Sequence, residues 1–294
     1  MRKTKVGFQG EHGAYSEVAI YKQFGRSVDT VPSVSIHEVF NLAEVEAVDF
    51  GVVPVENSVE GSINETYDML LSSNLSVVGE VVLRIVHCLI ALRTAKLQGI
   101  RTVYSHPQAL AQCRNFVMSL GVEPIVTYDT AGSVKMIKEK QMIGAAAIAG
   151  EQAADLYGLK VLKRGIEDYS TNSTRFLVVA REERAKGMQP STAGWSSKRT
   201  RRMTPGHKTS LIFSVPHVPG SLYNALEIFA RQKINLTKIE SRPTKERPWE
   251  YYFYVDFEGD RSDSTVVKVL SELAKKTVFL KVLGSYPRSK AEGF

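Results

Sequence analysis

The sequence predicts an α/β protein built from two parts, and three observations support this fold class. Strand and helix patterns alternate over the first 180 residues, which favours mostly parallel sheets covered by helices. A basic, Ser/Thr-rich segment over 181–208 interrupts this alternation. Over 209–287 the patterns follow the order β-α-β-β-α-β, the split βαβ arrangement of ferredoxin-like domains. A length of 294 residues also suits about two domains.

Hydrophobic periodicity and capping signals justify each element of the first part. Ser35 with Glu38 three residues later has the spacing of a capping box, and Pro107 suits the first turn of a helix. The β-rich run over 75–92 is long enough to pass from one lobe to another. The expected strands are 6–8, 28–31, 48–53, 75–92, 100–104, 125–128, 145–149 and 159–162, and the expected helices are 13–24, 35–47, 61–71, 106–120, 130–140 and 152–157. Two such runs joined by a long strand predict two lobes with a ligand cleft between them, where strand ends and helix N-termini converge.

The second part has its own set of elements. Leu222, Leu226 and Phe229 recur at helical spacing, and the run over 251–257 alternates like a strand. The expected order is strand 209–215, helix 221–232, strand 234–239, strand 251–257, helix 264–275 and strand 278–283. About 80 residues suffice for an independent fold, and pairing with a second copy would protect the exposed edge of the sheet.

The net charge is concentrated in one segment. The chain has 38 Lys+Arg and 31 Asp+Glu, a formal charge of +7, and the segment 181–208 alone carries eight basic and two acidic residues. We interpret this segment as a solvated linker because it is not amphipathic and has a single aromatic residue. Nucleic-acid binding through it is the alternative, and would show as a steeply salt-dependent affinity.

Other classes of protein are excluded or disfavoured by simple counts. With 43% hydrophobic residues, 21 Gly and 11 Pro, the chain is neither collagen-like nor globally disordered. No run of about 18 apolar residues and no leader-like start is present, so we expect a cytoplasmic protein that binds neither membrane nor nucleic acid. Cys88 and Cys113 lack the spacing of a zinc site, so we expect buried, reduced thiols and no metal.

Polar clusters mark the ends of several expected strands. Gly7, Gly10 and Gly13 have the spacing GxxGxxG, a poor match to a dinucleotide loop, but they expose the helix start around 14–16, which suits a carboxylate. Four further clusters cover residues 54–62, 104–108, 128–133 and 172–176. Each cluster alone is explained by a helix cap or a turn. Their joint placement around one cleft predicts a ligand site.

The same clusters resemble a known family. The segments GFQGEHGAYSE (7–17), GVVPVENS (51–58), SHPQAL (105–110) and NSTRF (172–176) are similar to prephenate dehydratases. The segments PGSL (219–222) and IESRP (239–243) resemble the two phenylalanine-binding motifs of the regulatory ACT domain. The resemblance implies a two-lobed catalytic domain over 1–180, similar to periplasmic binding proteins, a basic linker over 181–208 and a ferredoxin-like ACT domain over 209–287.

The resemblance also implies a reaction, the conversion of prephenate into phenylpyruvate, water and carbon dioxide, without a metal or other cofactor. Thr174 matches the threonine of the family's Thr-Arg-Phe motif, and its hydroxyl is expected to orient or donate to the leaving hydroxyl. Arg175 is expected to bind a substrate carboxylate with two hydrogen bonds, and Phe176 is expected to pack against the substrate ring. In the alternative interpretation Arg175 pairs with a structural carboxylate such as Glu56, and Phe176 belongs to the core.

Further cleft residues follow from the same motifs. The expected donors to the second carboxylate or the keto-acid tail are Asn57, Ser58, His106, Gln108, Thr130 and Asn172. His106 could also serve as a general acid, or merely cap the helix that Pro107 opens. Glu56 is a second candidate acid, with a structural role as the alternative.

For the ACT part, the resemblance implies L-phenylalanine as an allosteric inhibitor bound between subunits, and therefore a homodimer or homotetramer. Gly220 would let the backbone approach the ligand, and Glu240 would orient the loop or receive the ammonium group. The expected site comprises Gly220, Ser221, Leu222, Asn224, Glu240, Ser241, Arg242 and Pro243. Ser221 departs from the alanine that is usual there. An arogenate dehydratase and a non-catalytic metabolite sensor are the alternative functions.

Overall fold

The computed structural model describes residues 2–185, 206–245 and 247–289. Of these, residues 2–67 with 81–177 form one compact unit, and residues 68–80 with the described residues from 178 to 289 form a second. Most of the predicted linker lies outside the described residues. Its described ends are a short helix, α8 (Glu182–Ala185), and the start of the strand that opens at His207.

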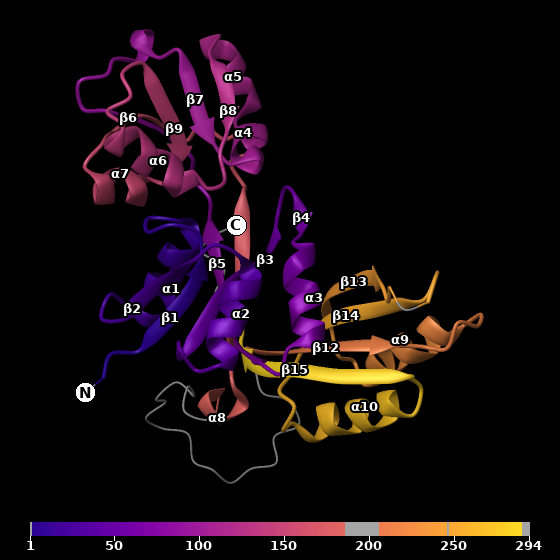
Figure 1. The fold of residues 1–294 in the computed structure, drawn as a ribbon. Helices are drawn as coiled ribbons and strands as arrows, with labels where there is room; N and C mark the ends of the chain where they lie inside the picture. Colours follow the sequence, from indigo (N-terminus) through magenta and orange to yellow (C-terminus); the bar gives the residue numbers. More distant parts are fainter. Residues whose placement is uncertain (1, 186–205, 246, 290–294) are drawn as a thin grey trace. The chain divides into compact units, whose positions relative to one another are not determined.

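The first lobe contains a sheet of order β2-β1-β3-β11-β5, with β4 paired to β3 (Figure 1). Its elements are β1 (Lys5–Gln9), α1 (Tyr15–Phe24), β2 (Asp29–Ser33), α2 (Ile36–Glu44), β3 (Phe50–Asn57), β4 (Gly61–Ser62), α3 (Asn64–Ser72), β5 (Ser76–Arg84) and β11 (Ser173–Ala180). Strand β1 runs parallel to β2 and β3. The predicted cap forms, because the Ser35 hydroxyl accepts from the Glu38 amide at 3.1 Å.

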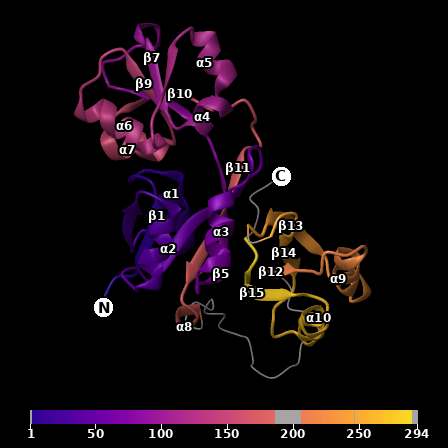
Figure 2. The ribbon, with the colours of Figure 1, turned by 45° about the vertical axis from the view of Figure 1, so that its right-hand side comes forward.

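The second lobe, in which Figure 2 labels the helices α4 to α7, contains a five-stranded sheet of order β10-β6-β9-β7-β8. Its elements are β6 (Cys88–Ala91), the 3₁₀ turn η1 (Leu97–Gly99), β7 (Thr102–Ser105), α4 (Pro107–Gln112), α5 (Arg114–Leu120), β8 (Glu123–Val126), α6 (Thr130–Glu139), β9 (Ala145–Ala149), α7 (Glu151–Tyr157) and β10 (Lys160–Arg164). Strand β7 is parallel to β8 and β9, whereas β6 is antiparallel to β9 and β10. This sheet is therefore mixed rather than mostly parallel.

Three elements differ from the sequence-based expectation. The run over 75–92 forms two strands in two sheets, β5 and β6, and so crosses between the lobes as predicted. The helix expected over 106–120 breaks at Cys113. There the Asp168 amide donates to the Gln112 carbonyl at 2.7 Å, and the Asp168 carboxylate accepts from the Asn115 amide at 3.3 Å. Strand β3 continues past Pro54 because β4 pairs with its end.

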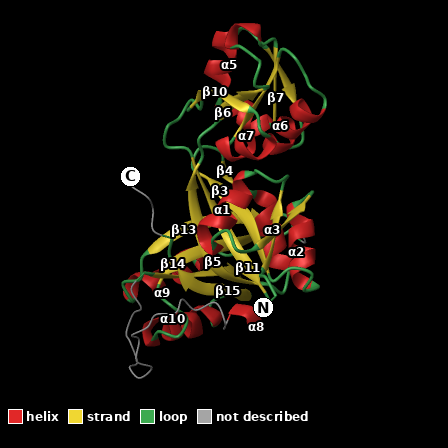
Figure 3. Cartoon of the chain, turned by 90° about the vertical axis from the view of Figure 1, so that its left-hand side faces the viewer, coloured by secondary structure: helices red, strands yellow, loops and turns green. Residues whose placement is uncertain are grey.

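The C-terminal part of the chain, from His207 to Pro287, forms a four-stranded antiparallel sheet of order β13-β14-β12-β15. Its elements are β12 (His207–Ser214), α9 (Ser221–Arg231), β13 (Leu236–Pro243), β14 (Tyr251–Glu258), α10 (Ser264–Ala274) and β15 (Phe279–Pro287) (Figure 3). Phe213 and Phe257 of the sheet share one buried cluster with Phe229 and Leu273 of the two helices, so both helices cover the same face. The predicted ferredoxin-like order is confirmed.

Two further expectations bear on the class of protein. Cys88 and Cys113 are both buried and free, and burial raises the pKa of each thiol, so both stay protonated. Within the described parts of the chain, no helix combines the length and the apolar character that a bilayer crossing requires.

Candidate active site

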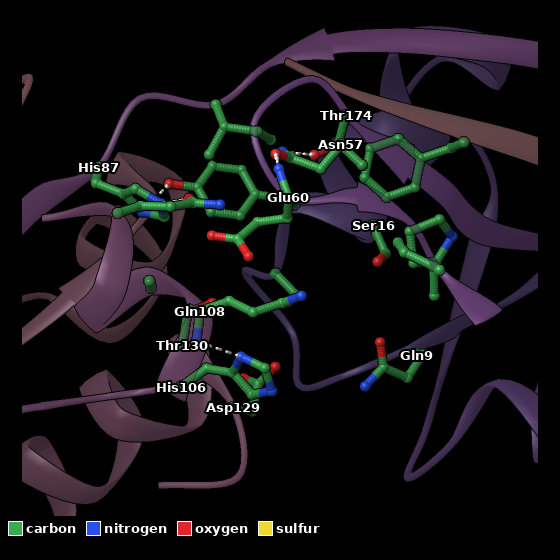
Figure 4. A pocket seen from close by; sticks show the side chains of 18 of the residues that line it. Gln9, Ser16, Asn57, Glu60, His87, His106, Gln108, Asp129, Thr130 and Thr174 are labelled. Carbon is green, nitrogen blue, oxygen red and sulfur yellow. Dashed lines mark hydrogen bonds between the residues drawn. The ribbon is translucent and has the colours of Figure 1, made fainter. Parts of the chain in front are cut away.

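A pocket of about 160 Å³ lies in the first unit and takes its walls from both lobes (Figure 4). Strands β3 and β11 and the starts of α1, α4 and α6 contribute to it. Its polar lining consists of Gln9, Tyr15, Ser16, Asn57, Glu60, His87, His106, Gln108, Gln112, Tyr128, Asp129, Thr130 and Thr174. None of the described residues that line it is a lysine or an arginine. Any anion bound here is therefore held by neutral donors and helix ends.

Strand β11 separates the three residues of the Thr-Arg-Phe motif onto two faces. Thr174 and Phe176 both line the pocket, as expected for residues two apart on a strand. Arg175 points to the other face, where its Nε lies 2.8 Å from Glu56 Oε1. Phe176 is also 2% exposed. The geometry thus favours the alternative in which Arg175 pairs with Glu56, whereas Phe176 serves as both core and pocket wall.

The Asn57 carboxamide is held in one orientation by the backbone. Its Oδ1 accepts from the amides of Val59 at 2.9 Å and Glu60 at 3.0 Å. Its Nδ2 therefore faces inward and donates to Asn172 Oδ1 at 2.7 Å and to Thr174 Oγ1 at 3.0 Å. Among the described residues, no hydrogen bond uses the Thr174 hydroxyl as a donor. Its proton is consequently available to a molecule in the pocket.

The same chain of hydrogen bonds continues into the second lobe. Asn172 Nδ2 donates to Gln112 Oε1 at 2.8 Å, and the same oxygen lies 2.8 Å from His87 Nε2. His87 Nδ1 in turn lies 3.0 Å from the Tyr15 hydroxyl, which is also 2.9 Å from the Val86 carbonyl. Burial lowers the pKa of His87 and raises that of Tyr15, so both side chains are neutral.

Two helix starts bring further polar groups to the pocket. Tyr15 and Ser16 are the first residues of α1, whose N-terminal dipole favours a carboxylate. His106 and Gln108 flank the start of α4, and His106 Nδ1 accepts from the Gln108 amide at 3.3 Å. His106 therefore combines the capping role that the sequence allowed with a place in the pocket, and burial lowers its pKa.

Two carboxyl groups also line the pocket. Asp129 caps α6 by accepting from the Gly132 amide at 2.6 Å, next to Thr130 at the start of that helix. Burial raises the pKa of Asp129. Glu60 ends the turn that follows β3 and extends toward the middle of the pocket (Figure 4).

Two of the predicted donors support the site without lining it. The Ser58 hydroxyl donates to the Thr171 carbonyl at 3.1 Å and accepts from the Ser173 amide at 2.9 Å, which fastens the β3 turn to the start of β11. Asn172 is 1% exposed and connects Asn57 to Gln112. The other predicted residues, namely Asn57, His106, Gln108, Thr130 and Thr174, lie together in the pocket.

Eight polar lining residues were not among the named candidates, namely Gln9, Tyr15, Ser16, Glu60, His87, Gln112, Tyr128 and Asp129. Gln112 lies one helical turn after Gln108, so helical spacing is a signal that could have indicated it. Asp129 and Glu60 belong to polar clusters already noted in the sequence. His87 lies in an apolar run, and no local pattern distinguishes it.

A second cavity, of about 390 Å³, lies in the C-terminal part of the chain. Of the predicted phenylalanine-binding residues, Ser221 and Leu222 line it, together with the loop 215–219 and Tyr251 and Phe253 of β14. Gly220 has φ +83°, a conformation that favours glycine, and its carbonyl accepts from the Asn224 amide at 2.9 Å.

The second predicted motif, Glu240 to Pro243, lies on β13 and does not line this cavity. Its register places Ser241 opposite Phe253 and Pro243 opposite Tyr251, beside the cavity wall. The Arg242 guanidinium forms an ion pair with Asp68 at 2.9 Å, within the same unit. Glu240 is 3.7 Å from Lys238.

Comparison with known proteins agrees with this architecture. The family model for prephenate dehydratase matches residues 6–184, and that for the ACT domain matches residues 209–275. Arogenate dehydratase/prephenate dehydratase 2, chloroplastic, of Arabidopsis thaliana is 42% identical over 97% of this chain and 73% of its own length. The bifunctional chorismate mutase/prephenate dehydratase of Aquifex aeolicus is 41% identical over 98% of this chain and 75% of its own length.

A solved structure extends the similarity to three dimensions. Prephenate dehydratase from Arthrobacter aurescens in complex with L-Phe has a TM-score of 0.83 and 29% identity, and the match covers 99% of this chain and 92% of that one. The two-lobed α/β part and the ACT part inferred from motifs are thus confirmed at the level of the family. The chain belongs to the prephenate dehydratase family and carries a C-terminal ACT domain.

Proposed function

We propose that the chain converts prephenate into phenylpyruvate, carbon dioxide and water, with the Thr174 hydroxyl as the donor to the departing ring hydroxyl. The observation that carries this proposal is the order of hydrogen bonds at Asn57, whose Nδ2 donates to Thr174 Oγ1 and leaves the hydroxyl proton free. A donor aimed at a leaving oxygen stabilises the charge that develops there.

The reaction needs little more than placement and hydrogen bonding. The bond between the ring and its carboxylate breaks, and its electron pair moves through the ring to the opposite carbon, where the bond to the hydroxyl breaks. The products are carbon dioxide and an aromatic ring, and the departing hydroxide takes one proton to become water. Aromatisation supplies the driving force, so the residues must orient the dianion and assist the leaving oxygen.

The absence of lysine and arginine from the described pocket lining suits this reaction. A cation bound to the leaving carboxylate would stabilise the ground state more than the transition state, in which that group is losing its charge. Neutral donors such as Ser16, Gln108 and Thr130 bind the substrate tail without this penalty. Phe176 offers a flat wall to the ring.

Thr174→Ala tests the assignment. We expect folding to be preserved and kcat for prephenate to fall about 10²- to 10³-fold, the usual cost of removing one such donor. Thr174→Ser is the matched control, because it keeps the hydroxyl and should retain most of kcat. Wild-type kcat in Thr174→Ala, followed by phenylpyruvate absorbance, would refute the role. No turnover by the wild-type protein would favour the metabolite sensor.

Arogenate is a second candidate substrate, and the carboxyl groups of Glu60 and Asp129 in the pocket favour it. Arogenate carries an ammonium group where prephenate has a keto oxygen, and a carboxylate partner stabilises an ammonium group. The ratio of kcat/KM for the two substrates decides between them. Glu60→Gln should lower kcat/KM for arogenate more than for prephenate if Glu60 contacts the amine.

We also propose feedback inhibition by L-phenylalanine at the ACT domain over 209–287. A mostly apolar cavity between α9 and β14, lined by Leu222, Tyr251 and Phe253, supports an aromatic ligand. The helix start at Ser221 suits its carboxylate. L-phenylalanine should give a heat of binding in calorimetry, and it should lower kcat in the activity assay. Neither effect in the active protein would argue against the proposal.

The ACT sheet supports a homodimer or homotetramer. Strands β13 and β15 are its two edges, and Ile239 on β13 is 47% exposed. Pairing of edge strands between copies covers their free backbone groups. Light scattering after size-exclusion chromatography should give a multiple of the 32.7 kDa chain mass.

A further inference from the structure

His87 is a buried imidazole that the proposed reaction does not use directly. It is 2% exposed and lies between β5 and β6, where the chain crosses from one lobe to the other. Its backbone amide donates to Glu167 Oε2 at 2.9 Å, and its ring contacts Tyr15 edge-on with the centroids 5.6 Å apart. Both ring nitrogens have side-chain partners, Tyr15 and Gln112.

The backbone around Asn57 determines which nitrogen of His87 carries the proton. The amides of Val59 and Glu60 can only donate, so the Asn57 oxygen faces them and its NH₂ group faces Asn172. Asn172 must then present its oxygen to Asn57 and its NH₂ group to Gln112. Each amide in the series thereby fixes the orientation of the next.

The series ends at the imidazole. Gln112 presents its oxygen to Asn172 and, at 2.8 Å, to His87 Nε2, so Nε2 must donate. A neutral imidazole has one N–H, and Nδ1 is therefore an acceptor. The Tyr15 hydroxyl lies 3.0 Å from Nδ1 and 2.9 Å from the Val86 carbonyl, so its single proton is shared between these two acceptors. Burial lowers the pKa of His87, in agreement with a neutral ring.

The opposite tautomer would let Nδ1–H donate to the Tyr15 oxygen and the Tyr15 hydroxyl donate to the Val86 carbonyl, but it conflicts with the carboxamide series at the other end. A bare Nε2 would face the Gln112 oxygen, so Gln112 would have to turn its NH₂ group toward His87 and Asn172. Asn172 would then turn its own NH₂ group toward Asn57, whose carboxamide the backbone amides prevent from turning. One donor would oppose another, which costs about 1–3 kcal/mol for each buried group left unsatisfied.

We propose that His87 is a positioning residue for the reaction: its Nε2–H holds the Gln112 carboxamide and, through it, Asn172. Asn172 then supports, from the side opposite the Val59 and Glu60 amides, the Asn57 orientation that leaves the Thr174 hydroxyl free to donate. This inference rests on the proposed function of Thr174. The links are carboxamides, which accept and donate hydrogen bonds but do not transfer protons at neutral pH. His87 therefore acts on orientation and is not the source of the proton.

Three substitutions separate orientation from simple packing. His87→Gln keeps an N–H donor near the position of Nε2, His87→Leu keeps volume without a donor, and His37→Leu removes an exposed histidine on α2 as a control. We expect His87→Leu to lose at least about tenfold in kcat for prephenate with KM changed by less than about threefold, and His87→Gln to restore most of kcat. The control should behave as wild type.

A spectroscopic measurement keeps the test independent of folding in the variants and of turnover. In wild-type protein with ¹⁵N-labelled histidine, the resonance absent from a His87 variant should report a neutral ring protonated at Nε2. A ring protonated at Nδ1 would overturn the inference, as would wild-type kcat in folded His87→Leu or an equal loss in His87→Gln. Absence of prephenate turnover by the wild type would refute the proposed function, while the tautomer would still be measured.

Discussion

Asn57→Asp reverses the donor at the centre of the site while it preserves the shape of the side chain. The two bonds from the Val59 and Glu60 amides survive, because a carboxylate accepts them. The two bonds donated by Nδ2, to Asn172 at 2.7 Å and to Thr174 at 3.0 Å, are lost. The Thr174 hydroxyl would turn to donate to the new carboxylate and would no longer be available to substrate.

The structure gives the size of the two effects. In Asn57→Asp the bond to Asn172 is lost and the bond with Thr174 is reversed, so the free energy of unfolding falls by roughly 1 kcal/mol. Loss of the Thr174 donor lowers kcat by about 10²- to 10³-fold, or roughly 3–4 kcal/mol in the transition state. In Asn57→Ala all four bonds disappear, so the fold is less stable, but the Thr174 proton stays free. We therefore expect the isosteric variant to be the slower enzyme and the truncated variant to be the less stable one.

Steady-state assays with prephenate rank the two variants by kcat, and urea unfolding ranks them by free energy of unfolding. The kcat of Asn57→Asp should also rise relative to wild type as the pH falls, because a protonated carboxyl regains one donor. The reasoning is refuted if Asn57→Asp turns over as fast as Asn57→Ala, or if its activity does not depend on pH differently from wild type.

Three other perturbations test separate features of the chain. Glu56→Gln removes the carboxylate charge that lies 2.8 Å from Arg175 Nε, at a site where the Arg175 side chain is 9% exposed. The free energy of unfolding should fall by about 2–3 kcal/mol with little change in KM, and a large rise in KM would contradict the structural role. Burial lowers the pKa of His87, so the unfolded state binds more protons than the folded state as the pH falls below about 6.5. The free energy of unfolding of wild type, measured by urea titration between about pH 7 and 5.5, should therefore fall relative to that of His87→Gln. The same pH dependence in both proteins would exclude this linkage. Gly220→Ala strains a residue at φ +83° by about 1–2 kcal/mol and should weaken inhibition by L-phenylalanine without changing kcat in its absence; unaltered inhibition would separate Gly220 from the ligand.

Local signals in the sequence were sufficient for most elements and for part of the site. The spacing of Ser35 and Glu38 predicted the start of α2 because a capping box depends only on neighbouring residues. Polar clusters at strand ends predicted the residues that converge in the pocket, because parallel strands present their ends at one edge of a sheet. The family resemblance added Thr174, but its pairing with Asn57 is a contact across 117 positions of sequence.

Features that depend on distant contacts could not be predicted in this way. The break in the helix over 106–120 is caused by Asp168, more than 50 positions away from the carbonyl and amide that it binds. The strand β11 returns to the first sheet after the whole second lobe, and this return is what sends Arg175 to Glu56 instead of into the pocket. His87 has no distinguishing neighbours in sequence, so only the fold reveals its partners.

The arrangement of charge explains why orientation matters so much at this site. Six of the seven net positive charges fall in 181–208, and the described pocket lining contains no cation. A pocket that binds a dianion with neutral groups depends on each hydroxyl and amide pointing the right way, since a reversed dipole changes attraction into repulsion. A histidine with one N–H at one end and two fixed backbone amides at the other specify the direction of every bond between them. The direction of the Thr174 donor is therefore set by the fold before any substrate arrives, which is the condition for electrostatic preorganisation.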